Sequence, residues 1–486
     1  MRRLLLFVLV CASVGTVFYF ASAAVSEPVA APEPRAVPTE GQAGPPEVVR
    51  YETAYRYPQA GWIVVHVEGE PYVRGYQQGR LLAKEIAAQI RMYATERSVK
   101  APADGWQAAR TIANALLLRK IDREYLEEMK GIAEGAADAG AVYEDREIDL
   151  MDIVVLNTWM ELETLEAALS AAPTGLEGKT FPRPGLPRAP APKPKQKDHC
   201  SAFIATGPAT ADGQIVFGHI TMSGLTSAPF VNVWLDVQPK TGRRFVMQAF
   251  PGAVWSSQDY YINDAGIVLS ETTINQTPLE PTGLSLASRT RKAIQYCESV
   301  DAIVKILSEK NNGLYTNEWL IGDLKTNEIA MYELGTRTSK LWRSSKDQWF
   351  GDTKGFYWGC NNAKDLAVRV EALPANGDEK PEDAEWEADE RDKAWLAFYK
   401  DHAGKIDAAA AKKTLTSAPL AADTSLDAKY ATADMAKKLS SHAMYGPPHG
   451  KTWKPTDEER RARPELVPHE PHPWTVLTID PPPARK

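Results

Sequence analysis

One cysteine, Cys200, lies where the sequence changes character. It follows residues 171–199, which are rich in proline and lysine and contain little that a core could bury. It also begins an apolar run that is typical of a β-strand. A thiolate is a strong nucleophile toward acyl carbons. We therefore take Cys200 as the candidate nucleophile, although cysteines also occur as inert core residues.

The position of Cys200 suggests how its thiol could be activated. Cleavage between His199 and Cys200 would put an α-amine on the residue that carries the thiol. An α-amine has a pKa of about 7.7–8.0, so much of it is neutral near neutral pH and can accept the thiol proton. The same thiol can attack the preceding carbonyl, an N→S shift that leads to self-cleavage. Because nucleophile and base belong to one residue, we expect neither a cofactor nor a metal.

The N-terminal residues predict export. Arg2 and Arg3 precede an apolar run over residues 4–20, and residues 21–23 (ASA) offer a small-residue cleavage site. We expect residues 1–23 to be a signal peptide, with an uncleaved anchor as the alternative, and residues 24–50 to be a disordered spacer. The mature chain would then work in a periplasmic, extracellular or lysosome-like compartment. It would have no stable membrane span once the signal is removed.

Composition excludes several classes of protein. Hydrophobic residues make up 44% of the chain and charged residues 24%, as in globular proteins. The net charge of −7 disfavours a nucleic-acid partner, and four cysteines are too few for a disulfide scaffold. HExxH and CxxC motifs do not occur in the sequence. Residues 446–452 (GPPHGKT) look like a phosphate loop, but two prolines remove amide donors that the loop would need.

Apolar spacing predicts the elements that would position Cys200. Helices are indicated over residues 75–92, 121–137 and 150–165, so residues 51–170 are expected to be a helical first chain. After the linker, strands are indicated over 201–206, 214–219, 229–237 and 244–250, with a hairpin over 319–324 and 328–334. Helices are expected over 285–309 and 392–413. The predicted class is α+β with a mainly antiparallel sheet, and residues 200–486 would form the catalytic domain, its last 35 residues wrapping over the surface.

Several short runs resemble the N-terminal nucleophile hydrolases of the phospholipase B-like and penicillin acyltransferase group. The matching runs are residues 74–82 (RGYQQGRLL), 127–135 (EEMKGIAEG), 200–202 (CSA), 218–219 (GH), 250–252 (FPG), 262–273 (INDAGIVLSETT) and 315–319 (YTNEW). The resemblance extends from about residue 50 to 365. It implies an αββα sandwich of two mainly antiparallel sheets between helical layers, self-activation, and cleavage or transfer of an acyl group at an amide or ester.

The resemblance also suggests roles for individual residues. Cys200 matches the nucleophile, and His219 matches a position that is often Arg in the wider group. Thr273 matches an oxyanion-hole position, although Thr272 could face the site instead. Asn361 matches an Asn near the nucleophile's amine. Arg391 is the weakest match, to a late Arg that supports the site, and a surface ion pair is its alternative role.

Four further residues are candidates for the pocket. Met222 replaces an Asp that contacts the amine in much of the wider group, which raises the question of what orients the amine here. The other three are Trp255, Asn317 and Trp319, and both tryptophans are also plausible core residues. The sequence leaves open whether Cys297 and Cys360 pair.

The sequence thus predicts an exported, self-cleaving cysteine hydrolase or acyltransferase. Its partners would be a small acyl substrate (a lipid, an N-acyl amide or a peptide) and its own cleaved N-terminal fragment, which should stay bound as part of the sandwich. Two alternatives remain open at this stage. One is a non-catalytic binding protein on the same fold, and the other is a papain-like cysteine protease.

Overall fold

The computed structural model describes residues 47–170, 200–371, 386–463 and 465–480, and these belong to one compact unit. The expected signal peptide, nearly all of the spacer and the linker over 171–199, with His199, lie outside the described residues. So does much of the acidic stretch over 377–390. None of the helices in the described part is long and apolar enough to cross a membrane.

The larger of two main sheets has ten strands. Neighbouring strands in this sheet are antiparallel, except for β3 and β8, which pair in parallel. The β3–β8 pair joins the strands before the linker to the strands after it. Their spatial order is β1 (Val49–Tyr51), β2 (Ala54–Gln59), β3 (Trp62–Gly69), β8 (Val233–Pro239), β9 (Phe245–Ala249), β10 (Tyr260–Asn263), β11 (Ile267–Thr273), β12 (Asn317–Asp323), β13 (Glu328–Leu334) and β14 (Ser339–Arg343).

The second sheet has six strands, all antiparallel to their neighbours. Their order is β15 (Phe356–Gly359), β6 (Ser201–Ala205), β7 (Val216–Ile220), β16 (Asp427–Thr432), β17 (Ser441–Tyr445) and β18 (Thr475–Leu477). Cys200 directly precedes β6, which lies inside this sheet rather than at its edge. A third, two-stranded sheet pairs β4 (Val142–Tyr143) with β5 (Arg146–Glu147).

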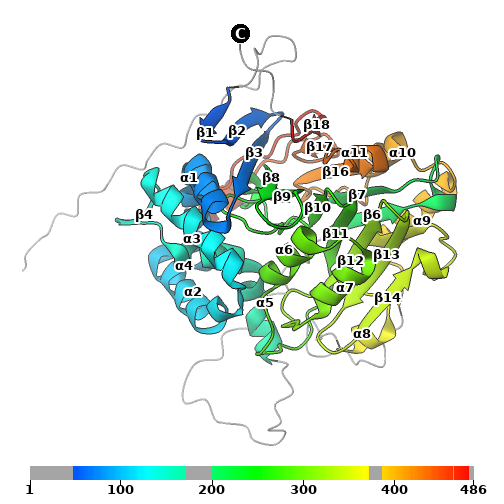
Figure 1. The fold of residues 1–486 in the computed structure, drawn as a ribbon, viewed down its shortest axis with the longest axis horizontal. Coiled ribbons are helices and arrows are strands. Elements are labelled where there is room, and N and C mark those ends of the chain that lie inside the picture. The colour runs from blue at the N-terminus through cyan, green and yellow to red at the C-terminus, as the bar shows by residue number, and fades with distance from the viewer. Residues whose placement is uncertain (1–46, 171–199, 372–385, 464, 481–486) are drawn as a thin grey trace, which may run out of the picture. The chain divides into compact units, whose positions relative to one another are not determined.

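Three hydrophobic clusters define four layers. The first lies between the ten-stranded sheet and its helices, the second between the two sheets, and the third between the six-stranded sheet and its helices. The expected αββα sandwich is therefore confirmed (Figure 1). The first helical layer holds α1 (Pro71–Arg97), α2 (Pro102–Leu116), α3 (Arg123–Asp138), α4 (Leu150–Asn157), α5 (Trp159–Ser170), α6 (Leu286–Tyr296) and α7 (Val300–Ser308), and the opposite layer holds α9 (Glu390–His402) and α10 (Ala408–Thr414).

Strand β12 shows why such a sandwich forms. Trp319 and Ile321 face the helices, while Leu320 faces the second sheet, and all three are buried. Successive side chains of a strand point to opposite faces, so a strand between two layers is apolar on both. The continuous apolar run within this strand is therefore the signature of a sheet that is covered on each side.

Helices α1 and α3 pack with their backbones in contact. An added Cβ at Gly79 would lie 2.1 Å from the carbonyl oxygen of Ile132, and one at Gly131 would lie 2.1 Å from that of Tyr72. Both glycines belong to the two helical runs that resemble the hydrolase group. The close approach of two helices accounts for glycine in those runs, since any side chain would force the helices apart.

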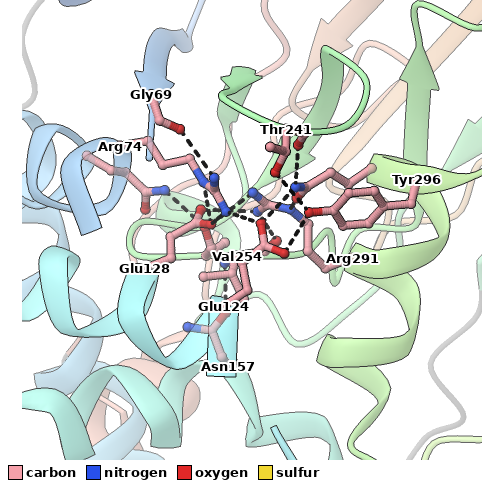
Figure 2. A network of polar contacts seen from close by, with 12 residues as sticks. Gly69, Arg74, Glu124, Glu128, Asn157, Thr241, Val254, Arg291 and Tyr296 are labelled. Atoms are coloured by element: carbon pink, nitrogen blue, oxygen red, sulfur yellow. Dashed lines mark hydrogen bonds and ion pairs between the residues drawn. The ribbon is translucent and has the colours of Figure 1, made fainter. Parts of the chain in front are cut away.

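A buried polar network connects the first segment to the second (Figure 2). Glu128 of α3 lies between Arg74 of α1 and Arg291 of α6, and all three side chains are fully buried. The Arg74 Nε–Glu128 Oε2 distance is 2.6 Å, and the Arg291 Nη2–Glu128 Oε2 distance is 2.9 Å. Arg291 also donates to the carbonyl oxygen of Val254 at 2.6 Å. The bond between Arg291 and Glu128 joins residues on the two sides of the predicted cleavage.

The elements differ from the sequence-based expectations in four places. Residues 51–170 are not helical throughout, because β1–β3 contribute three strands to the larger sheet. The helix expected over 285–309 is two helices, since Ser299 caps α7 by accepting a hydrogen bond from the Ala302 N–H. The helix expected over 392–413 is also two helices, α9 and α10. In the last 35 residues, for which only a surface wrap was expected, β18 forms the edge strand of the smaller sheet.

Candidate active site at Cys200

Cys200 lies at the inner end of a small cavity between the sheets and the first helical layer. The residue is 4% exposed, and its Sγ lies 3.8 Å from the Met222 carbonyl oxygen. The cavity has a volume of about 20 Å³, room for about one water molecule. Both segments line it, with Gln89, Tyr93 and Met160 from before the linker and Thr221, Met222, Gln258, Asp259 and Tyr315 among those after it.

His219 lies beside Cys200 on the neighbouring strand β7, and both of its ring nitrogens are engaged. Nε2 lies 3.0 Å from the Glu271 carbonyl oxygen, which can only accept, so this nitrogen carries the proton. Nδ1 accepts a hydrogen bond from Lys429 Nζ at 3.0 Å. Burial and the adjacent Lys429 hold the pKa of His219 well below its usual range. His219 is thus a neutral, fixed ring with no spare lone pair for a thiol proton.

Lys429 of β16 fixes this part of the site. Its ammonium donates to His219 Nδ1, to Thr221 Oγ1 at 2.7 Å and to Asp427 Oδ1 at 2.7 Å, so each of its three hydrogens has an acceptor. Asp427 also accepts from Gln248 Nε2 at 2.7 Å. All of these side chains are buried. Burial lowers the pKa of Lys429, while Asp427 opposes that change, as expected for a buried ion pair.

Two buried carboxyl groups, Asp259 and Glu271, lie in contact next to Cys200. The Cys200 Sγ, a His219 ring nitrogen and an Asp259 carboxylate oxygen all lie within 4.8 Å of one another. Burial and mutual repulsion raise the pKa of Glu271 well above its usual range, and burial also raises the pKa of Asp259. Two such groups can hydrogen-bond to each other only if one of them holds a proton.

Alternation along β11 decides which threonine faces the site. Thr273 shares a strand face with Glu271, and it lies beside Tyr315, which lines the cavity. Thr272 points to the other face, where its Oγ1 accepts from the backbone N–H of Asn361 at 3.5 Å. Thr273 is therefore the threonine on the side of the site. Asn317 is its direct cross-strand partner and is 2% exposed, so it lies next to Thr273 without lining the cavity.

Asn361 and Arg391 meet at the backbone of Cys200. Arg391, in the first turn of α9, donates through Nη1 to the Cys200 carbonyl oxygen at 2.5 Å and to Asn361 Oδ1 at 3.2 Å. Asn361 Nδ2 donates to the Thr273 carbonyl oxygen at 2.6 Å, which leaves its second amide hydrogen for another acceptor. Arg391 thus contacts both the candidate nucleophile's backbone and Asn361. A separate hollow of about 220 Å³ borders both residues.

The other candidates lie elsewhere. Trp255 and Trp319 are 2% and 1% exposed in the cluster beneath the helices and do not line the cavity at Cys200, because their rings fill the core. Cys297 lies in that same cluster, and Cys360 lies in the cluster on the far side of the smaller sheet, where its Sγ donates to Asp392 Oδ1 at 2.9 Å. No disulfide joins any two of the three cysteines in the described part of the chain.

Sequence reasoning missed Asp259, Glu271 and Lys429. Glu271 could have been found, because it lies two residues before Thr273 and period-two alternation puts both on one strand face. Lys429 sits between alanine and tyrosine in a strand, and a lysine in a buried strand is unusual unless it is paired. Asp259 carries no such signal, since it lies in the loop before β10 with a positive φ of 61°.

The Phospholipase B family model matches residues 115–373, more than half of the chain, and the chain belongs to this family. An uncharacterized protein of Archaeoglobus fulgidus is 26% identical over 282 residues, which covers 55% of this chain and 42% of that protein. Human phospholipase B-like 1 is 28% identical over 210 residues, covering 41% and 35%. The chain therefore spans less than half of the length of either relative.

Two solved structures are also similar in part. A Caenorhabditis elegans ortholog of N-acylethanolamine-hydrolyzing acid amidase has a TM-score of 0.35 at 10% identity, covering 48% of this chain and 93% of the other. Penicillin V acylase from Agrobacterium tumefaciens has a TM-score of 0.25 at 13% identity, covering 51% and 83%. The αββα layers of this chain are defined by its own hydrophobic clusters.

Proposed function

We propose that this member of the Phospholipase B family is an exported hydrolase that cleaves an acyl bond, amide or ester, with Cys200 as nucleophile. Cleavage before Cys200 would activate it, and the new α-amine would take the thiol proton. The segment before the linker would remain bound as part of the sandwich. The family's name does not decide between a lipid, an N-acyl amide and a peptide as substrate.

One observation carries this proposal: the histidine next to the thiol is fully engaged. A Cys–His pair needs a ring nitrogen with a lone pair directed at the thiol. The Nδ1 lone pair of His219 accepts from Lys429, and Nε2 carries a proton that goes to the Glu271 carbonyl oxygen. The α-amine of Cys200 could accept the thiol proton in place of His219. The papain-like alternative, which needs a histidine base, is therefore disfavoured.

The surroundings of Cys200 supply the other parts of an acyl-transfer site. The free amide hydrogen of Asn361 and the hydroxyl of Thr273 are candidate donors to the oxyanion that forms when the thiolate adds to a carbonyl. Arg391 ties Asn361 to the backbone of Cys200. In the uncut chain the cavity at the thiol holds little more than one water, so activation would also have to open it.

Intact-mass analysis of the purified protein tests the proposal. We expect two fragments, one of which begins at Cys200, and we expect Cys200→Ala to give a single uncut chain. Cys297→Ala is the matched control, because it removes a buried thiol away from the site and should still be cleaved. A fully active enzyme that stays in one piece would contradict the proposal, and a Cys200→Ala protein that keeps its biological role would favour the non-catalytic binding protein.

A further inference from the structure

We infer that Asp259, backed by Glu271, is the counter-ion that positions the α-ammonium group at Cys200 after cleavage. The inference rests on the function proposed above and adds a residue to it. Asp259 would be a positioning residue: it holds the α-nitrogen, which becomes an ammonium group when it takes the thiol proton, and it does not itself attack the substrate.

Cleavage before Cys200 would create a cation in a buried place. Cys200 is 4% exposed, and an unpaired buried charge is strongly unfavourable. Met222 supplies only a backbone carbonyl and a thioether on that side. Asp427, the nearby carboxylate on β16, already forms an ion pair with Lys429 at 2.7 Å. The new ammonium group therefore needs another anion.

Asp259 is placed to be that anion. One of its carboxylate oxygens lies within 4.8 Å of Cys200 Sγ, and both residues line the same cavity. The α-nitrogen belongs to the same residue as that sulfur, so a small shift of the new chain end brings it into contact with the carboxylate. The loop is held in place, since Ser256 donates its N–H to the Tyr261 hydroxyl and accepts from the Tyr260 N–H.

Glu271 explains how the pair carries a single charge. It is fully buried, and among the described residues its carboxyl oxygens have no N–H or hydroxyl donor, so its polar neighbour is the carboxyl of Asp259. The pair can therefore share one proton and bear one negative charge. The titratable and charged groups that face Asp259 from the packed elements are Cys200, His219, Tyr261, Glu271, Tyr315, Asp427 and Lys429.

The negative charge of the carboxyl pair then has a cationic partner only in the cleaved state. Lys429 and Asp427 cancel each other, and His219 is neutral. The carboxyl pair with one proton has a charge of −1, and the α-ammonium group would neutralise it. Before cleavage that partner is missing, which fits the raised pKa values of both carboxyl groups in the uncut chain.

The test uses the full chain with a protease recognition sequence inserted directly before Cys200, so that the α-amine forms whether or not the chain cleaves itself. The probe is cyanate, and the readout is the pH midpoint for carbamylation of the Cys200 α-amine, followed by mass spectrometry. In Asp259→Asn/Glu271→Gln the anion is gone, so we expect the midpoint to fall by about one pH unit or more, because an adjacent negative charge stabilises the ammonium form. Glu271→Gln keeps the charge on Asp259 and should stay within about 0.3 units of the parent.

The outcomes separate this inference from the proposed function. A double variant with the parent's midpoint would overturn the role of Asp259, whatever the parent chain does. Absence of self-cleavage in the chain without the inserted site would overturn the proposed function alone. If the double variant does not fold, Asp259→Asn replaces it in the test. This variant keeps the Glu271 carboxyl, which is farther from Cys200, so the midpoint should shift in the same direction but by less. An unchanged midpoint in Asp259→Asn would also overturn the role of Asp259.

Discussion

At the scale of single residues, the site is defined by which lone pairs and hydrogens are already used. His219, the residue that looks most like a catalytic base, has both nitrogens occupied, by Lys429 and by the Glu271 carbonyl. Asn361 has one amide hydrogen used and one free. These details separate residues that hold the site in place from residues that could act on a substrate.

Replacing His219 by glutamine tests its role. A glutamine amide can donate to the Glu271 carbonyl oxygen and accept from Lys429, so it can replace both bonds of the ring. We expect the rates of self-cleavage and of p-nitrophenyl ester hydrolysis to stay within about tenfold of the parent. A loss of about 10²–10⁴-fold would instead identify His219 as a general base. His219→Ala, which makes neither bond, is the comparison and should be impaired.

Asn361→Ala tests the oxyanion donor. We expect kcat for the same ester to fall about 10²–10³-fold with little change in KM, because the amide would stabilise charge that develops only in the transition state. Cys360→Ala is a neighbouring control, since its thiol lies in the cluster beneath α9 and bonds to Asp392. An Asn361→Ala enzyme with parental kcat would exclude this role.

At the scale of elements, the crossing of α1 and α3 depends on two backbones that touch. We expect Gly79→Ala to lower the free energy of unfolding by about 2 kcal/mol or more, because its Cβ would meet the Ile132 carbonyl oxygen at 2.1 Å. Chemical denaturation monitored by circular dichroism measures the change. Gly224→Ala is the matched control, since its only neighbour within 4 Å lies at 3.6 Å, and it should be nearly neutral.

The contact between α5 and α6 is expected to be sensitive to pH. Glu161 of α5 accepts from the Leu286 N–H at 3.1 Å and from Asn312, and burial raises the pKa of Glu161 to about 7. The folded chain thus keeps this proton to a higher pH than the unfolded chain does. Its contribution is complete below about pH 4.5 and is lost as the pH rises to about 7.

Glu161→Gln should remove this dependence, since glutamine does not ionise. Relative to the parent, the variant should gain about 3 kcal/mol in unfolding free energy between pH 4.5 and pH 8. Urea titrations at both pH values measure the gain. Glu127→Gln, at a well-exposed position on α3, controls for loss of a surface charge. Parallel stability curves for parent and Glu161→Gln would rule out the assignment.

At the scale of the whole molecule, the segments before and after the linker form one structure. Strand β3 pairs with β8 across the linker, and the network of Arg74, Glu128 and Arg291 joins α1 and α3 to α6 (Figure 2). After cleavage we expect the two fragments to elute together on native size-exclusion chromatography and to separate only in denaturant.

Glu128→Ala should weaken this association. It leaves the buried guanidinium group of Arg291 without its carboxylate, while Arg74 keeps Glu124, and breaking a buried ion pair in this way costs about 3–5 kcal/mol. The denaturant concentration that separates the cleaved fragments should fall accordingly. Glu134→Ala, an exposed change on the same helix, should not alter it. Fragments that separate freely in the parent protein would contradict the shared sandwich.

Much of the fold could be predicted from local patterns. Apolar spacing predicts the strand that follows Cys200, the hairpin of β12 and β13, and helices α1 and α3. It does so because this spacing depends only on which face of a single element is buried. Strands β1–β3 and β16–β18 were not predicted, because they are stable only by pairing with strands that are distant in sequence. The break before α7 was also missed, although Ser299 is a residue that favours a cap.

What the sequence determined by itself was the candidate nucleophile and its setting. A thiol directly after a run rich in proline and lysine, and directly before a strand, is a local property that can be found in the order of residues. Only the tertiary structure decided which groups surround it: Asp259, His219, Glu271, Arg391 and Lys429 come from five separate stretches of chain. These groups affect one another's protonation only when packing brings them within a few ångströms and excludes water. Burial has this effect because charges interact more strongly when water no longer screens them.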